Sequence, residues 1–183
     1  MGKRFLSDYI KAYHNTLTVL DCEALILRFE RSGAEQERKT RPGAYNFTQL
    51  DVTHHWPDVD QKIRQILLTC YNQYQISLNA RQFWPDSFQM EHLRLKRYLS
   101  DGEERFEPHV DVMRASDSRR FATAILYLNA PEGGETVFPD LNISVIPEPG
   151  KVIIFPPLWI FPHAGLAPER KAKYILHSYL WYA

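Results

Sequence analysis

Two histidines and one aspartate have the residue types and spacing of a candidate metal site. One residue separates His109 from Asp111, and His163 follows much later in the chain. On a β-strand, residues i and i+2 point to the same face, so His109 and Asp111 would present an imidazole and a carboxylate together. A His-x-Asp pair alone is a weak signal, because it also occurs by chance on surfaces. His163, in the segment Phe-Pro-His-Ala-Gly, offers the third ligand that a site requires.

This ligand set predicts a particular metal chemistry. Two imidazoles and one carboxylate on one face of a metal leave its other coordination positions open, which is the arrangement that non-haem Fe(II) oxygenases use. Zinc accepts the same ligands but has no redox chemistry, so a zinc-dependent hydrolase is an alternative. No residue stands out as the general base that such a hydrolase needs. The set therefore favours Fe(II).

The residues around the candidate ligands are predicted to form strands. After Pro85, short runs rich in Val, Ile, Leu and Tyr alternate with Gly, Pro and Asn, which is typical of strands joined by turns. The strands are expected near residues 88–99, 106–112, 121–129, 134–138, 142–146, 151–156 and 173–182. Many short strands in so short a segment indicate a sandwich or jelly roll.

Two helices are predicted before the strands. The first runs over residues 21–29 with Asp21 as its cap, and the second begins at Pro57, a favoured first helical residue, and ends near Leu78. Residues 33–45 are polar and predict a mobile loop. The helices are expected to pack on the outside of one sheet. The chain then forms one domain, residues 1–183, with mostly helical support in 1–85 and a jelly-roll core in 86–183.

Composition limits the classes of partner. Lys+Arg and Asp+Glu both number 22, so the net charge is about zero, which argues against nucleic acid and membrane surfaces as general partners. The apolar runs are too short to cross a bilayer, and no signal peptide is evident, so a cytoplasmic location is expected. Cys22 and Cys70 lie in apolar helical patterns and predict buried free thiols. The oligomeric state is not indicated.

The stretch from Tyr98 to Tyr182 resembles the prolyl 4-hydroxylase-like branch of the 2-oxoglutarate-dependent oxygenases. Five segments match in the family's order and spacing: residues 106–111, 123–129, 133–138 and 149–155, and His163 followed by 173–176. The resemblance implies a double-stranded β-helix, a jelly roll with iron at its mouth. It also implies a hydroxylase that uses Fe(II), 2-oxoglutarate and O₂, with ascorbate as a further candidate cofactor.

The resemblance assigns roles to individual residues. His109, Asp111 and His163 match the iron ligands. Lys173 matches the basic residue that pairs with the far carboxylate of 2-oxoglutarate, a role that suits a buried ammonium, and Lys171 is the competing candidate. Three more residues are expected to line the cosubstrate pocket, namely Tyr127, Tyr98 and Thr123, which shares a face with Tyr127 by alternation.

Several charged residues depart from the family's pattern. On an unbroken strand, Arg94 and Lys96 share the face of Tyr98, where relatives usually have uncharged residues. Charges inside a dry barrel are unfavourable unless they are paired. Either a bulge turns both side chains to solvent, or both face a wet mouth and bind a negative group on the substrate.

Three further residues are candidates for substrate contact. Arg119 is expected to share the face of Thr123, and His177 that of Lys173. Trp159 lies in a proline-rich loop just before His163. It either covers the active site or takes part in ordinary packing.

Two kinds of substrate and one non-enzymatic function remain open. A prolyl or other peptidyl residue is the first choice of substrate, on resemblance alone. A free amino acid or a small carboxylate-bearing metabolite is the alternative, favoured by Arg94 and Lys96. A non-catalytic jelly-roll binding module is the alternative of another class, and the intact triad together with Lys173 argues against it.

Overall fold

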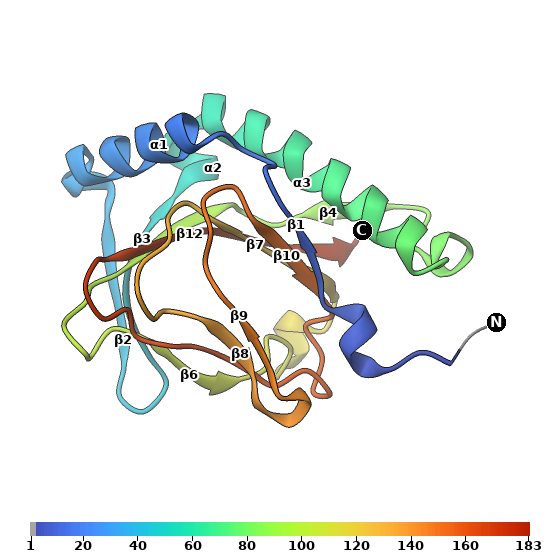
Figure 1. Cartoon of the computed structure of the whole chain (residues 1–183). Helices are drawn as coiled ribbons and strands as arrows, with labels where there is room; N and C mark the ends of the chain where they lie inside the picture. The colour runs from blue at the N-terminus through green and yellow to red at the C-terminus, as the bar shows by residue number, and fades with distance from the viewer. Residues whose placement is uncertain (1–2) are drawn as a thin grey trace.

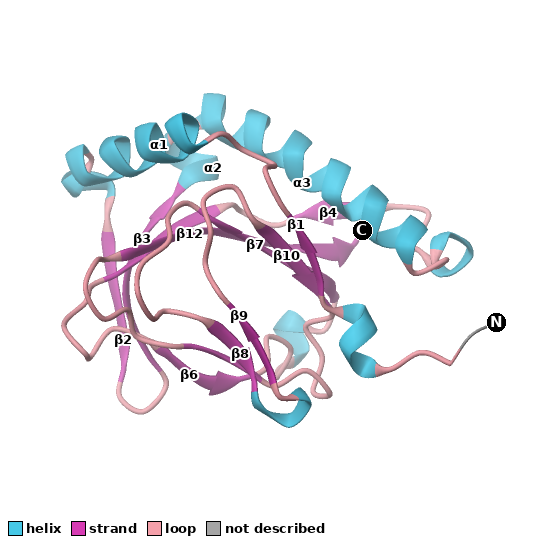
Figure 2. Ribbon diagram, viewed as in Figure 1, coloured by secondary structure: helices cyan, strands magenta, loops and turns pink. Residues whose placement is uncertain are grey.

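The computed structural model describes residues 3–183, and its strands join in one antiparallel sheet that curls back on itself (Figures 1 and 2). The strands are β1 (Lys11–Tyr13), β2 (Glu37–Arg41), β3 (Tyr45–Asp51), β4 (Phe88–Met90), β5 (Arg94–Tyr98), β6 (Phe106–His109), β7 (Arg120–Tyr127), β8 (Thr136–Phe138), β9 (Ile143–Val145), β10 (Val152–Phe155), β11 (His163–Gly165) and β12 (Lys173–Tyr182). Their order is β1-β10-β7-β12-β5-β3-β6-β11-β8-β9, with β2 beside β3 and β4 beside β12. The predicted double-stranded β-helix is confirmed.

The central strands have two buried faces, because side chains alternate along each strand. Leu95, Leu126 and Leu176 belong to the core shared with the helices. Their neighbours Tyr127 and Ile175 belong to a second apolar cluster inside the curl. The sheet therefore separates a structural core from an inner space that can hold a site.

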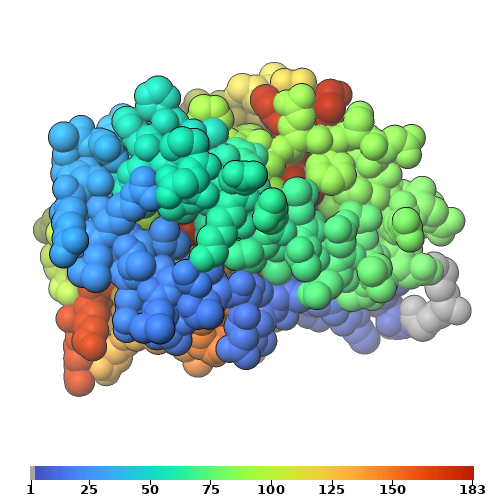
Figure 3. All heavy atoms as spheres, turned by 90° about the horizontal axis from the view of Figure 1, so that it is seen from above, coloured from blue at the N-terminus to red at the C-terminus, as the bar shows by residue number. Residues whose placement is uncertain are grey.

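The helices cover one outer face of the sheet, as predicted (Figure 1). They are α1 (Val19–Arg31), α2 (Val52–His55) and α3 (Pro57–Ser77), and seen from above they form much of the surface on this side (Figure 3). The second helix was predicted correctly. The first begins earlier than predicted because Thr18, not Asp21, is its cap: the Thr18 hydroxyl accepts a hydrogen bond from the Asp21 amide at 3.1 Å. None of the described helices is both long and apolar enough to cross a membrane.

The polar segment at residues 33–45 is not the predicted loop. It contains a 3₁₀ turn (Gly33–Glu35) and β2, which pairs with β3 in a hairpin. The β2 side chains are mostly exposed on both faces, so the strand carries no apolar alternation to reveal it. Strands β1–β3 place part of the first 85 residues in the sheet, and this region is therefore more than helical support. Cys22 and Cys70 are buried free thiols, as predicted.

Candidate active site

The curl of the sheet brings the three candidate metal ligands together. Strand β6 ends at His109, and Asp111 follows two residues later. Strand β11 begins at His163, which pairs with His109 across the two strands. One ligand atom from each residue lies within 4.8 Å of the others. His109 Nε2 is 3.7 Å and His163 Nε2 is 3.8 Å from the Asp111 carboxylate.

Hydrogen bonds orient both imidazoles toward the centre of the triad. Nδ1 of His109 lies 2.7 Å from the Glu107 carbonyl, and Nδ1 of His163 lies 3.1 Å from the Phe161 carbonyl. An Nδ1–H that donates to a carbonyl leaves the Nε2 lone pair free for a metal. Asp111 Oδ2 is buried without a hydrogen-bond partner. Two aimed nitrogens and an unsatisfied carboxylate oxygen fit a divalent cation such as Fe(II).

A buried polar network holds Asp111 from behind. The Tyr179 hydroxyl donates to Asp111 Oδ1 at 2.8 Å, and Arg120 donates to the Asp111 backbone carbonyl at 3.2 Å. The Arg120 guanidinium stacks on the Tyr179 ring at 4.0 Å and is bound by both carboxylate oxygens of Glu91, at 2.6 and 2.9 Å. Although burial opposes it, the neighbouring His109 and the other nearby histidines hold the pKa of Asp111 well below its usual value. Asp111 is therefore an ionised candidate ligand in a fixed orientation.

Removing the Tyr179 hydroxyl is expected to weaken metal binding without abolishing it. Tyr179→Phe keeps the ring that stacks on Arg120 but loses the hydrogen bond to Asp111 Oδ1. Loss of an outer contact to a metal ligand typically costs about 10–100-fold in metal affinity. Titration of metal-free protein with Mn(II), followed by electron paramagnetic resonance, measures this directly. Tyr182→Phe, in the same strand but half-exposed, is the control. Equal affinities in the two variants would contradict this role.

The opposite end of the pocket contains the buried Lys173. Its residue is 2% exposed, and its Nζ lies 5.2 Å from the centre of the Tyr98 ring. Burial lowers the pKa of Lys173 to about 7, and the charge of Glu135 only partly opposes this. Among residues 3–183, no carboxylate lies within ion-pair distance of this ammonium. Lys171 is exposed, so the geometry favours Lys173 over Lys171 as the partner of a dicarboxylate.

The space beside Lys173 is kept open by small and short side chains. Gly165 and Thr136 line the pocket there. Gly134 has a φ of +73°, and a Cβ at that position would lie 3.1 Å from Lys173 Cδ. Tyr127 was expected to line the pocket but does not; it is buried behind Thr136, and its hydroxyl donates to Thr136 Oγ1 at 2.7 Å. The arrangement can accept a carboxylate from an elongated ligand that reaches inward from the metal.

Of the two charged residues on β5, Lys96 faces the pocket and Arg94 does not. Lys96 is buried and lines the pocket with the triad, so no bulge turns it to solvent. Arg94, at the start of β5, is not among the residues that line this pocket, and its guanidinium reaches the His92 carbonyl at 3.4 Å. Burial lowers the pKa of Lys96 to about 8, although the charge of Asp111 opposes this.

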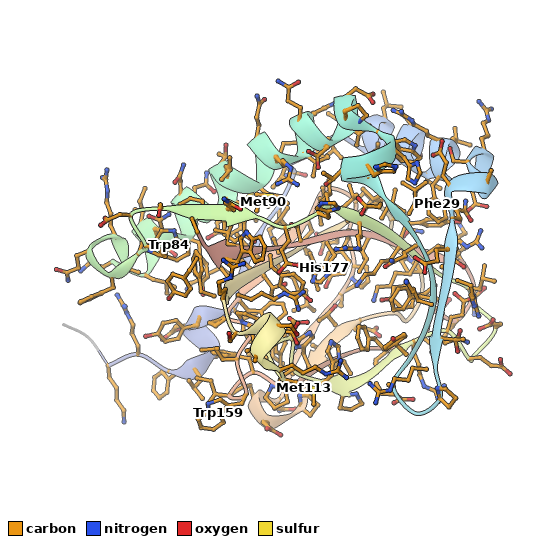
Figure 4. The ribbon with its side chains drawn as sticks, turned by 180° about the vertical axis from the view of Figure 1, so that it is seen from behind. Phe29, Trp84, Met90, Met113, Trp159 and His177 are labelled. Atoms are coloured by element: carbon orange, nitrogen blue, oxygen red, sulfur yellow. The ribbon has the colours of Figure 1, made fainter. Side chains whose placement is uncertain are left out.

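His177 lies in the pocket wall as its alternation predicts, but Thr123 does not: it is buried beside His177 and is not among the residues that line the pocket. His177 lines the pocket, with its Nδ1 at 3.3 Å from Lys96 Nζ and its Nε2 at 3.1 Å from Thr123 Oγ1. Burial lowers the pKa of His177 well below its usual value, and Lys96 adds to this effect. His177 is buried and lies near the middle of the view in Figure 4.

Arg119 and Trp159 are not placed as expected. A register shift between Leu180 and Trp181 breaks the alternation at the start of β7. Arg120 therefore faces Asp111, while Arg119 is exposed and stacks on Trp181 at 4.4 Å. Trp159 is 78% exposed, so it takes part in no ordinary core packing. It lies at the lower edge of Figure 4, away from His177.

Comparisons with known proteins agree with this geometry. Residues 93–181 match the model of the 2OG-Fe(II) oxygenase superfamily. No curated protein matches the chain significantly. A viral collagen prolyl hydroxylase from Paramecium bursaria Chlorella virus 1, in complex with 2OG, is 24% identical with a TM-score of 0.76, over 96% of this chain and 97% of that one.

Two cellular enzymes have the same fold. A Pseudomonas putida prolyl-4-hydroxylase is 21% identical with a TM-score of 0.66, over 96% of this chain and 93% of that one. A Trichoplax adhaerens prolyl hydroxylase, in complex with a hypoxia inducible factor peptide fragment, is 14% identical with a TM-score of 0.75, over 96% and 84%. Residues 93–181 are therefore a 2OG-Fe(II) oxygenase domain, and the chain is a 2-oxoglutarate-dependent dioxygenase that uses Fe(II), 2-oxoglutarate and O₂.

Proposed function

We propose that this dioxygenase hydroxylates an unactivated C–H bond of a prolyl or other residue within a peptide. The observation that carries the proposal is an open groove that includes His109 in its wall. The β2–β3 turn (residues 41–44), the segment 106–110, Met113 and Pro162 form its lining. Proline, alanine, valine and methionine side chains make much of this lining apolar. A groove of this kind suits an extended chain that passes the metal and presents one residue to it.

The similar structures support a peptide as substrate. All three are described as prolyl hydroxylases, and the Trichoplax adhaerens enzyme is in complex with a peptide fragment.

We assign the residues of the pocket to separate tasks. Bound Fe(II), with 2-oxoglutarate and O₂, supplies the oxidising power that converts C–H to C–OH and yields succinate and CO₂. His109, Asp111 and His163 would hold the metal on one side and leave its other side accessible. Lys173 binds the distal carboxylate of the cosubstrate and fixes its direction. The Phe106 ring stacks on His109 at 3.6 Å and keeps water from that side of the imidazole.

The direct test is substrate-stimulated turnover of 2-oxoglutarate. The Fe(II)-loaded protein is incubated with proline-containing peptides, matched peptides with alanine in place of proline, and free amino acids, and succinate is measured. The proposal expects stimulation by peptides and the gain of one oxygen atom in the peptide by mass spectrometry. Stimulation by free amino acids alone would replace it with the small-molecule alternative, which Lys96 favours.

The groove makes a separate prediction about peptide affinity. Met113→Glu places a charge in the apolar groove wall, so the KM for a stimulating peptide is expected to rise several-fold, while succinate formation without peptide stays unchanged. Ile76→Glu, on α3, is the matched control, since Ile76 is 73% and Met113 74% exposed. A peptide KM that both variants leave unchanged would show that the peptide does not use this groove.

A further inference from the structure

Lys96 carries a buried positive charge that the structure does not pair with a carboxylate. The residue is 7% exposed and lines the pocket that contains His109 and Asp111. Among residues 3–183, no carboxylate oxygen lies within 4.0 Å of its Nζ. Lys151 shows the contrasting arrangement: it is 6% exposed, and its Nζ binds both the Glu148 carboxylate and the Ile146 carbonyl. An unpaired buried ammonium beside a ligand pocket is unusual, because charges are rarely buried alone.

The groups around Lys96 hold its ammonium in place but do not neutralise it. Nζ lies 4.9 Å from the centre of the Phe47 ring and 5.7 Å from that of Phe106. It also lies 3.3 Å from His177 Nδ1. An ammonium donates hydrogen bonds only, so His177 Nδ1 is the acceptor and its Nε2–H donates to Thr123 Oγ1. Two aromatic faces and a neutral imidazole stabilise a cation and leave its charge free for an anion.

Charge balance shows that the cosubstrate does not need Lys96. Fe(II) carries two positive charges and Lys173 one, while 2-oxoglutarate carries two negative charges and Asp111 one. These four groups are together neutral. The carboxylate whose charge acts on Lys96 is Asp111, which the metal also neutralises. The loaded pocket would therefore keep one surplus positive charge, at Lys96, in the pocket that His109 and Asp111 also line.

We propose that Lys96, oriented by His177, is a subsite for a carboxylate of the substrate, distinct from the Lys173 subsite of the cosubstrate. The inference rests on the proposed function, because it assigns Lys173 and the triad to cosubstrate and metal. Phe106 lies under Lys96 and is stacked on His109, so a carboxylate at Lys96 lies close to the candidate metal. The carbon that is oxidised is then near an acidic group, which belongs either to a free amino acid or to a peptide.

Binding of a simple anion tests this subsite without knowledge of the substrate. The probe is ¹³C-labelled acetate, added to full-length protein that is loaded with Mn(II) and saturated with 2-oxoglutarate. Paramagnetic relaxation of the acetate carbon reports binding close to the metal. The wild type is expected to show saturable binding, and Lys96→Met is expected to weaken it about tenfold or more, because a charge-assisted hydrogen bond is lost.

Arg94→Met is the matched control, because Arg94 lies on the same strand two residues away and does not line the pocket. It is expected to leave acetate binding unchanged.

A second measurement is the binding of 2-oxoglutarate to Lys96→Met by calorimetry. The affinity is expected to match that of the wild type, which also shows that the variant is folded. If the methionine variant does not fold, Lys96→Gln takes its place. Acetate binding that is absent from the wild type, or unchanged in the Lys96 variants, overturns the proposal. A parallel loss of 2-oxoglutarate affinity overturns it too, since Lys96 would then serve the cosubstrate.

Two pairs of candidate substrates distinguish the sources of the carboxylate. Free amino acids are compared with their amides, and peptides with an acidic residue beside proline are compared with peptides that have the corresponding amide. The charged member of one pair is expected to stimulate the wild type more strongly, and Lys96→Met is expected to remove that preference. If no peptide is a substrate but acetate binds at Lys96, the peptide proposal fails and the subsite stands. If a peptide is hydroxylated but charge has no effect in either pair, the subsite fails and the peptide proposal stands.

Discussion

His163→Ala and His109→Ala are each expected to abolish tight metal binding and, with it, the conversion of 2-oxoglutarate to succinate. Each histidine offers one aimed Nε2 to a three-residue site, and no other group of histidines, cysteines and carboxylates in the described part of the chain could hold a metal. The loss should exceed the ~10–100-fold that an outer contact of a metal ligand costs, because a ligand itself is removed. Asp111→Ala is expected to impair turnover severely, since it removes the only anionic ligand of the three.

The experiment separates loss of the site from loss of the fold. His163 is 4% exposed and packs against the Phe155 ring at 4.8 Å, so its alanine variant also loses core packing. His163→Gln fills more of that space and is the better variant for measuring metal affinity. Mn(II) titration and thermal unfolding are measured on the same samples, with His14→Ala as the control, because His14 is a histidine with an exposed side chain. A folded His163 variant with near-normal succinate production would show that the triad is not the metal site.

The sequence predicted that His109, Asp111 and His163 lie together, because each part of this cluster has a local signal. His109 and Asp111 are two residues apart at the end of a strand, and the His163 segment stands next to a proline-rich loop. The pairing of His163 with His109 across β6 and β11 is a long-range contact. Spacing alone could not establish it, and the resemblance supplied it. Except for β11, which was not predicted, the later strands were predicted because they are apolar and interrupted by turn residues.

Strand β2 was not predicted because it lacks that pattern. β2 is a polar strand that pairs on one side only, with β3, and its mostly exposed side chains gave no apolar period. β3 connects the two parts of the sheet, because it pairs with β5 and also meets β6 at Tyr45 and Phe106. Its sequence, Tyr-Asn-Phe-Thr-Gln-Leu-Asp, alternates apolar and polar residues only over residues 45–48, and Gln49 breaks the alternation, so the signal for a strand was weak.

The residues behind Asp111 could not be predicted for a different reason. Alternation counted back from Thr123 predicts that Arg119 lies on the pocket side of the sheet. A register shift near Trp181 places Arg120 there instead. Glu91 lies in the break between β4 and β5, within what was expected to be one continuous strand. Bulges and breaks depend on the pairing of strands distant in sequence, which one sequence does not reveal.

Lys173→Ala is expected to raise the dissociation constant of 2-oxoglutarate more than a hundredfold and to leave metal affinity almost unchanged. Removing one member of a buried ion pair costs about 3–5 kcal/mol, and each ~1.4 kcal/mol is a factor of ten in affinity. Lys173 is 2% exposed, so water screens the pair with a carboxylate weakly. Lys171→Ala is the matched control, because Lys171 is an exposed lysine two residues earlier. If Lys171→Ala raised the dissociation constant of 2-oxoglutarate strongly and Lys173→Ala did so only slightly, Lys171 would be the residue that binds the carboxylate.

A second ligand shows whether the lost affinity belongs to the distal carboxylate. 2-Oxobutanoate keeps the 2-oxo acid group that faces the metal but lacks the carboxylate that is assigned to Lys173. Calorimetry on Mn(II)-loaded protein gives four dissociation constants, for two ligands and two proteins, and these form a thermodynamic cycle. Lys173→Ala should weaken the binding of 2-oxoglutarate far more than the binding of 2-oxobutanoate, because only 2-oxoglutarate loses a charge partner. If the affinities for both ligands fall equally, Lys173 supports the shape of the pocket around Tyr98 and Gly134 and does not bind the carboxylate.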